Sequence, residues 1–209
     1  MKTLTRYILS SFGGKIAKRE EIQRACTKFN ANPEKTINFM ISYGYFLRIL
    51  RGLYYVKNLE EFKFKKSINT NETLALAMEK LKVNWYFGLY TSLRLNGLTH
   101  EYFDTTFILN DRLFRPKEIK VAGEKVKFIK LKSKLLTFGI TKQNHIKFSD
   151  VEKTLLDIIY LSKYRSVSEE RIISIISDYN TNANARKIRE YLKSYPKTVE
   201  MVAKNAKLI

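Results

Sequence analysis

Three ionisable side chains have the types and spacing found in metal-dependent nucleases. Asp111 precedes a Glu-x-Lys pair, formed by Glu118 and Lys120, that falls on an expected strand. In such enzymes the carboxylates bind a divalent ion and the lysine helps to activate water. The chain is rich in lysine, however, and a solvated strand face accounts for the same spacing. We therefore expect that the protein is not an enzyme and keep the nuclease as an alternative.

The side chains for other catalytic or metal-binding chemistry are sparse. Cys26 is the only cysteine, and His100 and His145 are the only histidines. They make neither a histidine-rich metal site nor a persuasive nucleophile pair, so we expect no metal and no cofactor. A single cysteine cannot form an intrachain disulfide, which is consistent with the reducing cytoplasm.

The charge balance is strongly basic. Lysine and arginine number 39 against 20 acidic residues, which gives a net charge of +19 and a pI near 9.9. Residues 1–66 hold 14 basic and 5 acidic side chains and are the most basic region for their length. A lysine-rich surface kept for solubility is the alternative explanation. The asymmetry favours a polyanionic partner, with nucleic acid first, and no apolar run approaches the roughly 18 residues of a membrane span.

The N-terminal region has the pattern of a winged helix. One helical segment runs from about Lys18 to Phe29, and a second begins at Pro33 and ends near Tyr43, after a short polar break. Two short strands, 45–49 and 53–56, follow around a turn that contains Gly52. A glycine there supplies the positive φ of a tight hairpin. These elements predict a fold that places its second helix in a DNA groove.

The helical periodicity of the second segment separates a core face from a solvent face. Ile37, Met40 and Ile41 form the expected buried stripe. Four side chains then fall on the opposite side and are candidates for base contact: Lys35, Asn38, Phe39 and Ser42. Lysine suits guanine or phosphate, asparagine suits adenine, and serine takes either. Phe39 has two open interpretations, contact with a thymine methyl or packing on the second domain.

Four further cations flank this helix in the sequence. Arg48 lies on the expected hairpin and Arg51 at its tip, within reach of phosphates or the minor groove. Lys18 and Arg19, at the start of the first helix, are placed for contact with the DNA backbone.

The rest of the chain predicts a second domain after the polar stretch 65–70. Asn71 is the expected cap of a helix carrying Leu74 and Met78, and strands are expected at 105–109, 119–121, 125–128 and 146–148. Ser149 and Glu152 are read as a capping box before a helix from Val151 to Tyr160, and three more helices complete the tail. The prediction is an α+β protein: a winged helix-turn-helix domain at 1–66, then a mixed α/β domain at 67–209 with a small sheet and C-terminal helices.

A second basic feature follows the expected hairpin. It is a lysine ladder formed by Lys125, Lys127, Lys130, Lys132 and Lys134. A solvated strand face is one interpretation. The other is a second basic surface that follows phosphates or contacts an acidic toxin.

Three segments together resemble the AbiEi family of antitoxins. They are the wing at 44–56, the aromatic strand and helix at 85–98, which begins Trp-Tyr-Phe-Gly, and the helix at 149–157, which reads Ser-Asp-Val-Glu-Lys-Thr-Leu-Leu-Asp. The resemblance implies the antitoxin of a type IV toxin–antitoxin (abortive infection) system. Such a protein binds operator DNA, represses its own operon and counteracts a nucleotidyltransferase-like toxin. Residues after about Arg165 match no motif of the family.

The predicted function is therefore that of a cytoplasmic, DNA-binding transcriptional autorepressor and antitoxin, with double-stranded operator DNA and a cognate toxin as partners. Two alternatives stay open: the nuclease described above, and a winged-helix module that only binds RNA or protein.

Overall fold

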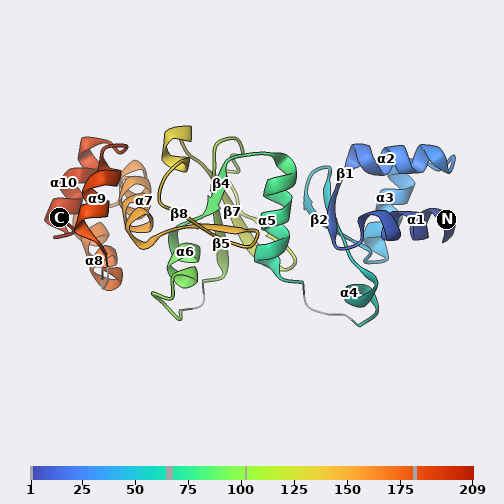
Figure 1. The fold of residues 1–209 in the computed structure, drawn as a ribbon, viewed down its shortest axis with the longest axis horizontal. Coiled ribbons are helices and arrows are strands. Elements are labelled where there is room, and N and C mark those ends of the chain that lie inside the picture. Colours follow the sequence, from blue (N-terminus) through green and yellow to red (C-terminus); the bar gives the residue numbers. More distant parts are fainter. Residues whose placement is uncertain (1, 65–67, 102, 181–182) are drawn as a thin grey trace. The chain divides into compact units, whose positions relative to one another are not determined.

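The computed structural model describes residues 2–64, 68–101, 103–180 and 183–209. The chain forms two compact units (Figure 1). The first comprises Met1–Lys82 with Lys120–Glu124, and the second comprises Val83–Ile119 with Lys125–Ile209. The two-domain division predicted from the sequence lies at 66/67, within residues 65–67, which are outside the described ranges. The compact units instead meet along the chain after Lys82.

In its described residues, the first unit combines five helices with a three-stranded sheet. In chain order its elements are α1 (Lys2–Phe12), β1 (Lys15–Lys18), α2 (Arg19–Lys28), α3 (Pro33–Ser42), β2 (Phe46–Leu50), β3 (Leu53–Val56), α4 (Leu59–Lys63) and α5 (Thr70–Leu81). The strands pair antiparallel in the order β1-β3-β2. The two helices and the hairpin expected for a winged helix are present in the expected order.

Apolar side chains from α1, α2 and α3 form the core of the first unit against its sheet. Ile22, Cys26 and Met40 have no exposed surface, and Phe46 and Val56 of the hairpin join the same cluster. The burial of Ile37 and Met40 agrees with the buried face predicted for α3 from their helical spacing. Burying one such side chain stabilises the fold by roughly 1.5–3 kcal/mol.

Two features of the first unit differ from the sequence-based expectation. Strand β1 was not foreseen, because Lys15-Ile16-Ala17-Lys18 is too short to show a clear alternation. Helix α5 is capped by Asn69, whose side chain accepts a hydrogen bond from the Glu72 amide, and not by Asn71. The helix therefore begins at Thr70. It packs against β1 and β3.

The second unit is built on a mixed sheet with the strand order β6-β7-β5-β4-β9-β8. The strands are β4 (Trp85–Phe87), β5 (Thr105–Asn110), β6 (Ile119–Val121), β7 (Glu124–Lys130), β8 (Ile140–Gln143) and β9 (Ile146–Ser149). β5 and β7 run parallel, as do β4 and β9, whereas β4–β5 and β8–β9 are antiparallel. The expected strands are confirmed, and the sheet is larger than predicted.

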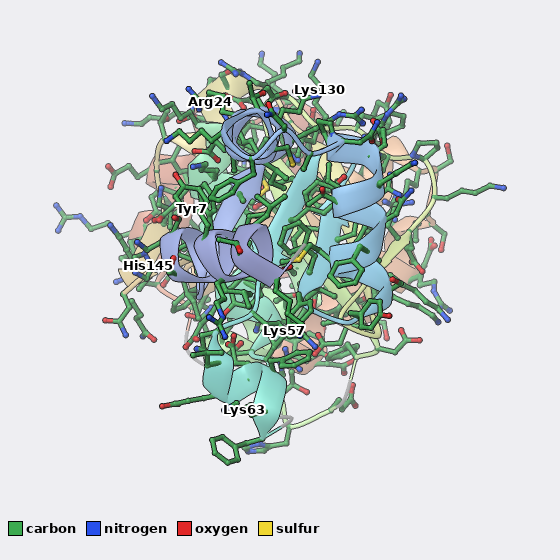
Figure 2. The ribbon with its side chains drawn as sticks, turned by 90° about the vertical axis from the view of Figure 1, so that its right-hand side faces the viewer. Tyr7, Arg24, Lys57, Lys63, Lys130 and His145 are labelled. Atoms are coloured by element: carbon green, nitrogen blue, oxygen red, sulfur yellow. The ribbon has the colours of Figure 1, made fainter. Side chains whose placement is uncertain are left out.

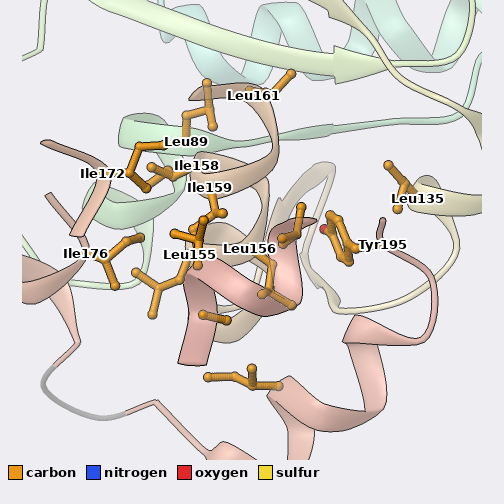
Figure 3. Close-up of a cluster of buried hydrophobic side chains, with 14 of the residues drawn as sticks. Leu89, Leu135, Leu155, Leu156, Ile158, Ile159, Leu161, Ile172, Ile176 and Tyr195 are labelled. Atoms are coloured by element: carbon orange, nitrogen blue, oxygen red, sulfur yellow. The ribbon is translucent and has the colours of Figure 1, made fainter. Parts of the chain in front are cut away.

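Helix α7 (Val151–Tyr164) is the central helix of the second unit. It contacts α6 (Leu89–Leu95), α8 (Glu169–Tyr179), α9 (Ala185–Leu192) and α10 (Lys197–Asn205). Leu155, Leu156 and Ile159 are fully buried in the cluster drawn in Figure 3. Most residues of α7 are buried, including the polar residues Glu152, Lys153 and Asp157, so the helix lies in the interior of this unit.

The predicted capping box at the start of α7 is wrong. Asp150, not Ser149, is the cap, because its Oδ1 accepts a hydrogen bond from the Lys153 amide at 2.9 Å. The Ser149 hydroxyl is buried and bonds to Thr154 and Ser92 instead. The Glu152 carboxylate accepts a hydrogen bond from the Asn184 amide at 2.9 Å. The overall mixed α+β class, with C-terminal helices, is as predicted.

Candidate nucleic-acid interface

Helix α3 presents a polar face to solvent, as its periodicity predicts. The Asn32 side chain caps it by accepting a hydrogen bond from the Lys35 amide at 3.0 Å, and Pro33 occupies the first turn. Ile37 and Met40 are buried. Ile41, expected in the buried stripe, is only half-buried.

Three of the four predicted base-contacting residues on α3 are exposed, namely Lys35, Asn38 and Ser42. The Ser42 hydroxyl donates to the Phe39 carbonyl of its own helix at 3.0 Å. Lys35 makes no ion pair with any residue that the structure describes. Among the described residues, the face therefore offers one unpaired cation and one unpaired carboxamide, which are side-chain types that bind base edges in DNA-binding proteins.

Phe39 does not share the exposure of its predicted neighbours. Its ring centroid lies 4.3 Å from that of Tyr43 and 6.4 Å from that of Tyr45. Tyr45 in turn stacks on Phe62 of α4 at 4.2 Å. Phe39 thus belongs to an aromatic row inside the first unit, an arrangement that neither sequence-based interpretation foresaw.

The hairpin carries both predicted arginines on its solvent side. Arg48 of β2 pairs with Tyr54 of β3, and its side chain is exposed. Arg51 is exposed in the turn, where Gly52 adopts a φ of +76°. Within the described part of the chain, neither guanidinium forms an ion pair. Both cations remain available to an external anion.

Of the two cations at the start of α2, Arg19 is engaged through its side chain, whereas Lys18 is engaged with the described residues only through its backbone amide. Arg19 forms an ion pair with Glu34 of α3, and its amide donates to the Gly52 carbonyl at 2.9 Å. The Lys18 amide donates to the Glu21 carboxylate at 2.8 Å. Arg19 therefore holds α2, α3 and the hairpin together. Figure 2 draws the side chains of this unit, with Arg24 further along α2.

The lysine ladder of the second unit is not one strand face. Strand β7 ends at Lys130, so Lys132 and Lys134 lie beyond it, with Lys134 in the short 3₁₀ helix η1 (Ser133–Leu136). Lys125 pairs with Asp104 at 2.5 Å, and Lys127 donates to the Pro116 carbonyl at 2.5 Å. The strand-face interpretation therefore does not extend to Lys132 and Lys134, because β7 ends at Lys130.

The residues of the alternative nuclease site are only partly brought together. Asp111 and Glu118 both line one pocket of the second unit. Lys120 is not among the residues that line this pocket. Among the described residues, no group of three or more histidine, cysteine, aspartate or glutamate side chains is arranged to hold a metal ion.

A buried polar cluster lies beneath the helix that resembles the family's late motif. Lys153 and Asp157 of α7 are fully buried, and the hydroxyls of Tyr86 and Tyr195 donate to Asp157 at 2.7 and 2.6 Å. The Lys153 ammonium also lies 4.4 Å from the Phe138 ring centroid. Tyr86, Lys153 and Asp157 lie in segments that resemble the family, whereas Tyr195 and Phe138 match no motif. Their contacts could not be predicted, because these residues are distant in the chain.

Burial shifts the pKa of each ionisable member of this cluster. Burial raises the pKa of the Asp157 carboxyl, and it lowers the pKa of Lys153. The pKa values of Tyr86 and Tyr195 lie well above the usual range, chiefly because of burial and secondarily because of the Asp157 charge. Each of these four side chains has a hydrogen-bond partner within the cluster.

Comparisons with known proteins establish the fold and nothing finer. No protein-family model matches the chain, and neither does any curated protein. The chain is similar to the crystal structure of the RV2827C protein from Mycobacterium tuberculosis, with a TM-score of 0.60 and 10% identity over 98% of this chain and 76% of that one. Of the helices in the described ranges, none has the length and apolar character needed to cross a membrane.

Proposed function

We propose that the protein is a DNA-binding autorepressor that also acts as the antitoxin of a type IV toxin–antitoxin system. The proposal joins two claims of different origin. DNA binding rests on the side chains of α3 and of the β2–β3 hairpin. Neutralisation of a nucleotidyltransferase-like toxin rests on the resemblance of three segments to the AbiEi family.

The observation that carries DNA binding is the set of free cations on one helix and one hairpin. Lys35, Arg48 and Arg51 are exposed and unpaired among the described residues, and Asn38 lies one turn from Lys35 on α3. A helix in the major groove with a hairpin on the adjacent backbone uses such groups. The net charge of +19 adds long-range attraction to the duplex.

This proposal distinguishes positioning contacts from sequence-reading contacts. Arg48 and Arg51 contact phosphates or the minor groove and set the affinity for any duplex. Asn38 and Lys35 read base edges and set the preference for the operator. Arg19 acts indirectly by holding the start of α3 through Glu34.

The test of DNA binding compares duplexes from the promoter of its own operon with shuffled duplexes of equal length. Replacement of Asn38 by alanine should reduce the preference for the promoter while leaving binding to shuffled DNA intact. Replacement of Arg48 should weaken both. If Asn38→Ala left the preference unchanged, α3 would not be the reading helix.

The test of the antitoxin claim uses the neighbouring gene. We expect an adjacent reading frame for a nucleotidyltransferase-like toxin whose expression arrests growth. Co-expression of this chain should restore growth, and it should do so even with Arg48 and Arg51 replaced, because neutralisation does not depend on operator binding. Failure to restore growth with the intact chain would remove the antitoxin half of the proposal.

A further inference from the structure

The second unit contains a pocket of about 1100 Å³ that the proposed function does not use. Its walls come from the end of β5 and the loop after it, from β7 and the segment that follows, and from the last turns of α7. Small-molecule sites commonly measure about 300–1,000 Å³. The volume of this pocket is therefore large enough to hold a small molecule, or one unit of a longer ligand.

The loop that forms one wall is held by a buried side chain. Asn110 has no exposed surface, and its Nδ2 donates to the carbonyls of Leu113 and Ile129 at 3.1 and 3.2 Å. Its Oδ1 accepts hydrogen bonds from the amides of Arg112 and Leu113. One carboxamide therefore fixes the loop to β7, so the wall is preformed.

Cations dominate the polar part of the lining. Lys130, Lys132 and Arg165 line the pocket, and none of them forms an ion pair with a described residue. The acidic lining residues are Asp111 and Glu118. The surplus of free cations favours an anionic ligand, and phosphate is the anion that such groups bind in proteins.

Large aromatic side chains stand exposed at the same pocket. The exposed fraction is 61% for Phe114 and 83% for Tyr164, and both line it. Tyr160, one turn before Tyr164 on α7, adds a third ring. Exposed rings next to free cations are the combination with which proteins bind nucleotides, because each base stacks on a ring while its phosphate meets a cation.

An unpaired acceptor lies in the same lining. Asp111 Oδ2 accepts a hydrogen bond from the Asn84 side chain at 2.9 Å, whereas Oδ1 is buried and finds no partner among the described residues. A buried acceptor without a donor is costly, by roughly 1–3 kcal/mol. A ring N–H or amino group of a base would supply the missing donor.

We propose that this pocket binds a nucleotide. The phosphate meets Lys130 and Lys132, the base lies against Phe114 and Tyr164, and Asp111 accepts a hydrogen bond from the base. The partial negative charge at the C-terminus of α7 disfavours phosphate there, which places the base beside Tyr164. The nucleotide is either free or one unit of a single strand.

The experiment measures binding to the full chain by calorimetry, with four kinds of probe. They are the four nucleoside monophosphates in turn, ribose 5-phosphate, inorganic phosphate, and a tetranucleotide single strand. We expect nucleotides to bind more tightly than ribose phosphate or phosphate. Phe114→Ala and Tyr164→Ala should each weaken nucleotide binding by roughly 5- to 150-fold, the range for loss of one base–aromatic stack.

Matched controls separate the pocket from general charge and from folding. Phe64→Ala removes an exposed ring of the first unit, and Lys117→Gln removes an exposed lysine that does not line the pocket; neither should change binding, whereas Lys132→Gln should weaken it. The single strand is tested with Arg48 and Arg51 replaced, so that the hairpin does not contribute. Tighter binding of the strand than of any monophosphate identifies the strand as the source, and the reverse identifies a free nucleotide.

Three results would overturn the proposal: no binding of any nucleotide or strand, equal affinity for nucleotide and inorganic phosphate, or equal losses in the pocket and control variants. Since Phe114 and Tyr164 are exposed, their variants should fold normally, which thermal melts check. The outcome is independent of duplex binding by the first unit.

Discussion

Lys153 Nζ and Asp157 Oδ1 lie 3.5 Å apart, one turn along α7, and neither side chain has any exposed surface. The Asp157 carboxylate also accepts hydrogen bonds from two tyrosine hydroxyls. A buried charge pair stabilises a fold little more than an apolar pair of similar volume would. Removal of one partner is nevertheless costly, because it leaves the other charge buried without a counter-charge. This cluster therefore makes the second unit sensitive to single substitutions.

Replacement of Asp157 by alanine should lower the free energy of unfolding of the second unit by about 3–5 kcal/mol, because it strands the Lys153 ammonium and two phenols. The combined replacement Lys153→Met with Asp157→Leu should be less damaging than the sum of the two single changes. The free energies of unfolding of the single and double variants are measured by urea denaturation, followed by the fluorescence of Trp85. This residue is the only tryptophan and is buried in the second unit.

The exposed pair Glu200–Lys204 on α10 provides the control, because it also joins residues one turn apart, at 2.8 Å. Glu200→Ala should leave the Trp85 transition nearly unchanged, since exposed pairs contribute little. An equally small effect of Asp157→Ala would show that burial of the first pair has no energetic consequence.

The second unit should lose stability in alkali. Tyr86 and Tyr195 have pKa values raised by burial, so the folded protein keeps these protons when the unfolded chain loses them. Their stabilisation is complete below the unfolded tyrosine pKa of about 10 and falls as pH rises above it. The lowered pKa of Lys153 has the opposite effect, because it makes the stability of the unit rise with pH. This rise ends at about pH 10.4, where lysine in the unfolded chain loses its proton.

Urea midpoints for the Trp85 signal, taken between about pH 9 and 11, measure this dependence. Tyr86→Phe should be less stable at neutral pH and should show a shallower fall in alkali, because one buried phenol no longer titrates. A flat profile in the unsubstituted chain would contradict the assigned direction of the tyrosine pKa shifts.

Phe39 should matter for the stability of the first unit and not for base recognition. Phe39→Ala removes its contacts with Tyr43 and Tyr45, and we expect a loss of about 1–3 kcal/mol, below the value for a fully buried ring. Cys26 is the only cysteine and is fully buried in this unit, so its rate of thiol labelling reports the opening of the core. Normal labelling with relaxed operator preference would instead make Phe39 a base-contacting residue.

The hairpin arginines should control the salt dependence of DNA binding. Each phosphate contact contributes about 0.9 to the slope of log affinity against log salt. Arg48→Gln and Arg51→Gln should therefore each reduce the slope by roughly one, on operator and shuffled duplexes alike. Lys197→Gln, an exposed change on α10, is the control. If the arginine replacements left the salt slope unchanged, Arg48 and Arg51 would not contact DNA phosphates, and the duplex would bind at another surface.

Local sequence signals predicted much of the first unit. The 3.6-residue spacing of Ile37 and Met40 identified the buried face of α3, and Gly52 marked the hairpin turn. These features depend only on neighbours along the chain. The pairing of β1 with β3 joins residues that are about 40 positions apart in the sequence. No local pattern in Lys15–Lys18 predicts this pairing.

The errors have the same physical origin. Ser149 has the residue type of a helix cap, but its hydroxyl is taken by Ser92, which lies 57 positions away, and Asp150 caps α7 instead. A strand face was one of two interpretations of the lysine ladder, because lysines alternate with apolar residues up to Lys127. It does not extend to Lys132 and Lys134, which lie beyond β7. The pocket lined by Phe114, Lys132 and Tyr164 was not predicted at all, because it is assembled from three separated segments.

The most direct test of the central claim is the affinity of the full chain for its own promoter duplex relative to a shuffled duplex, measured across a salt series. The account predicts a preference of about 10³-fold or more that persists as salt weakens both affinities. Equal affinities for the two duplexes, with the same salt slope, would contradict specific repression and leave a protein that binds DNA through charge alone.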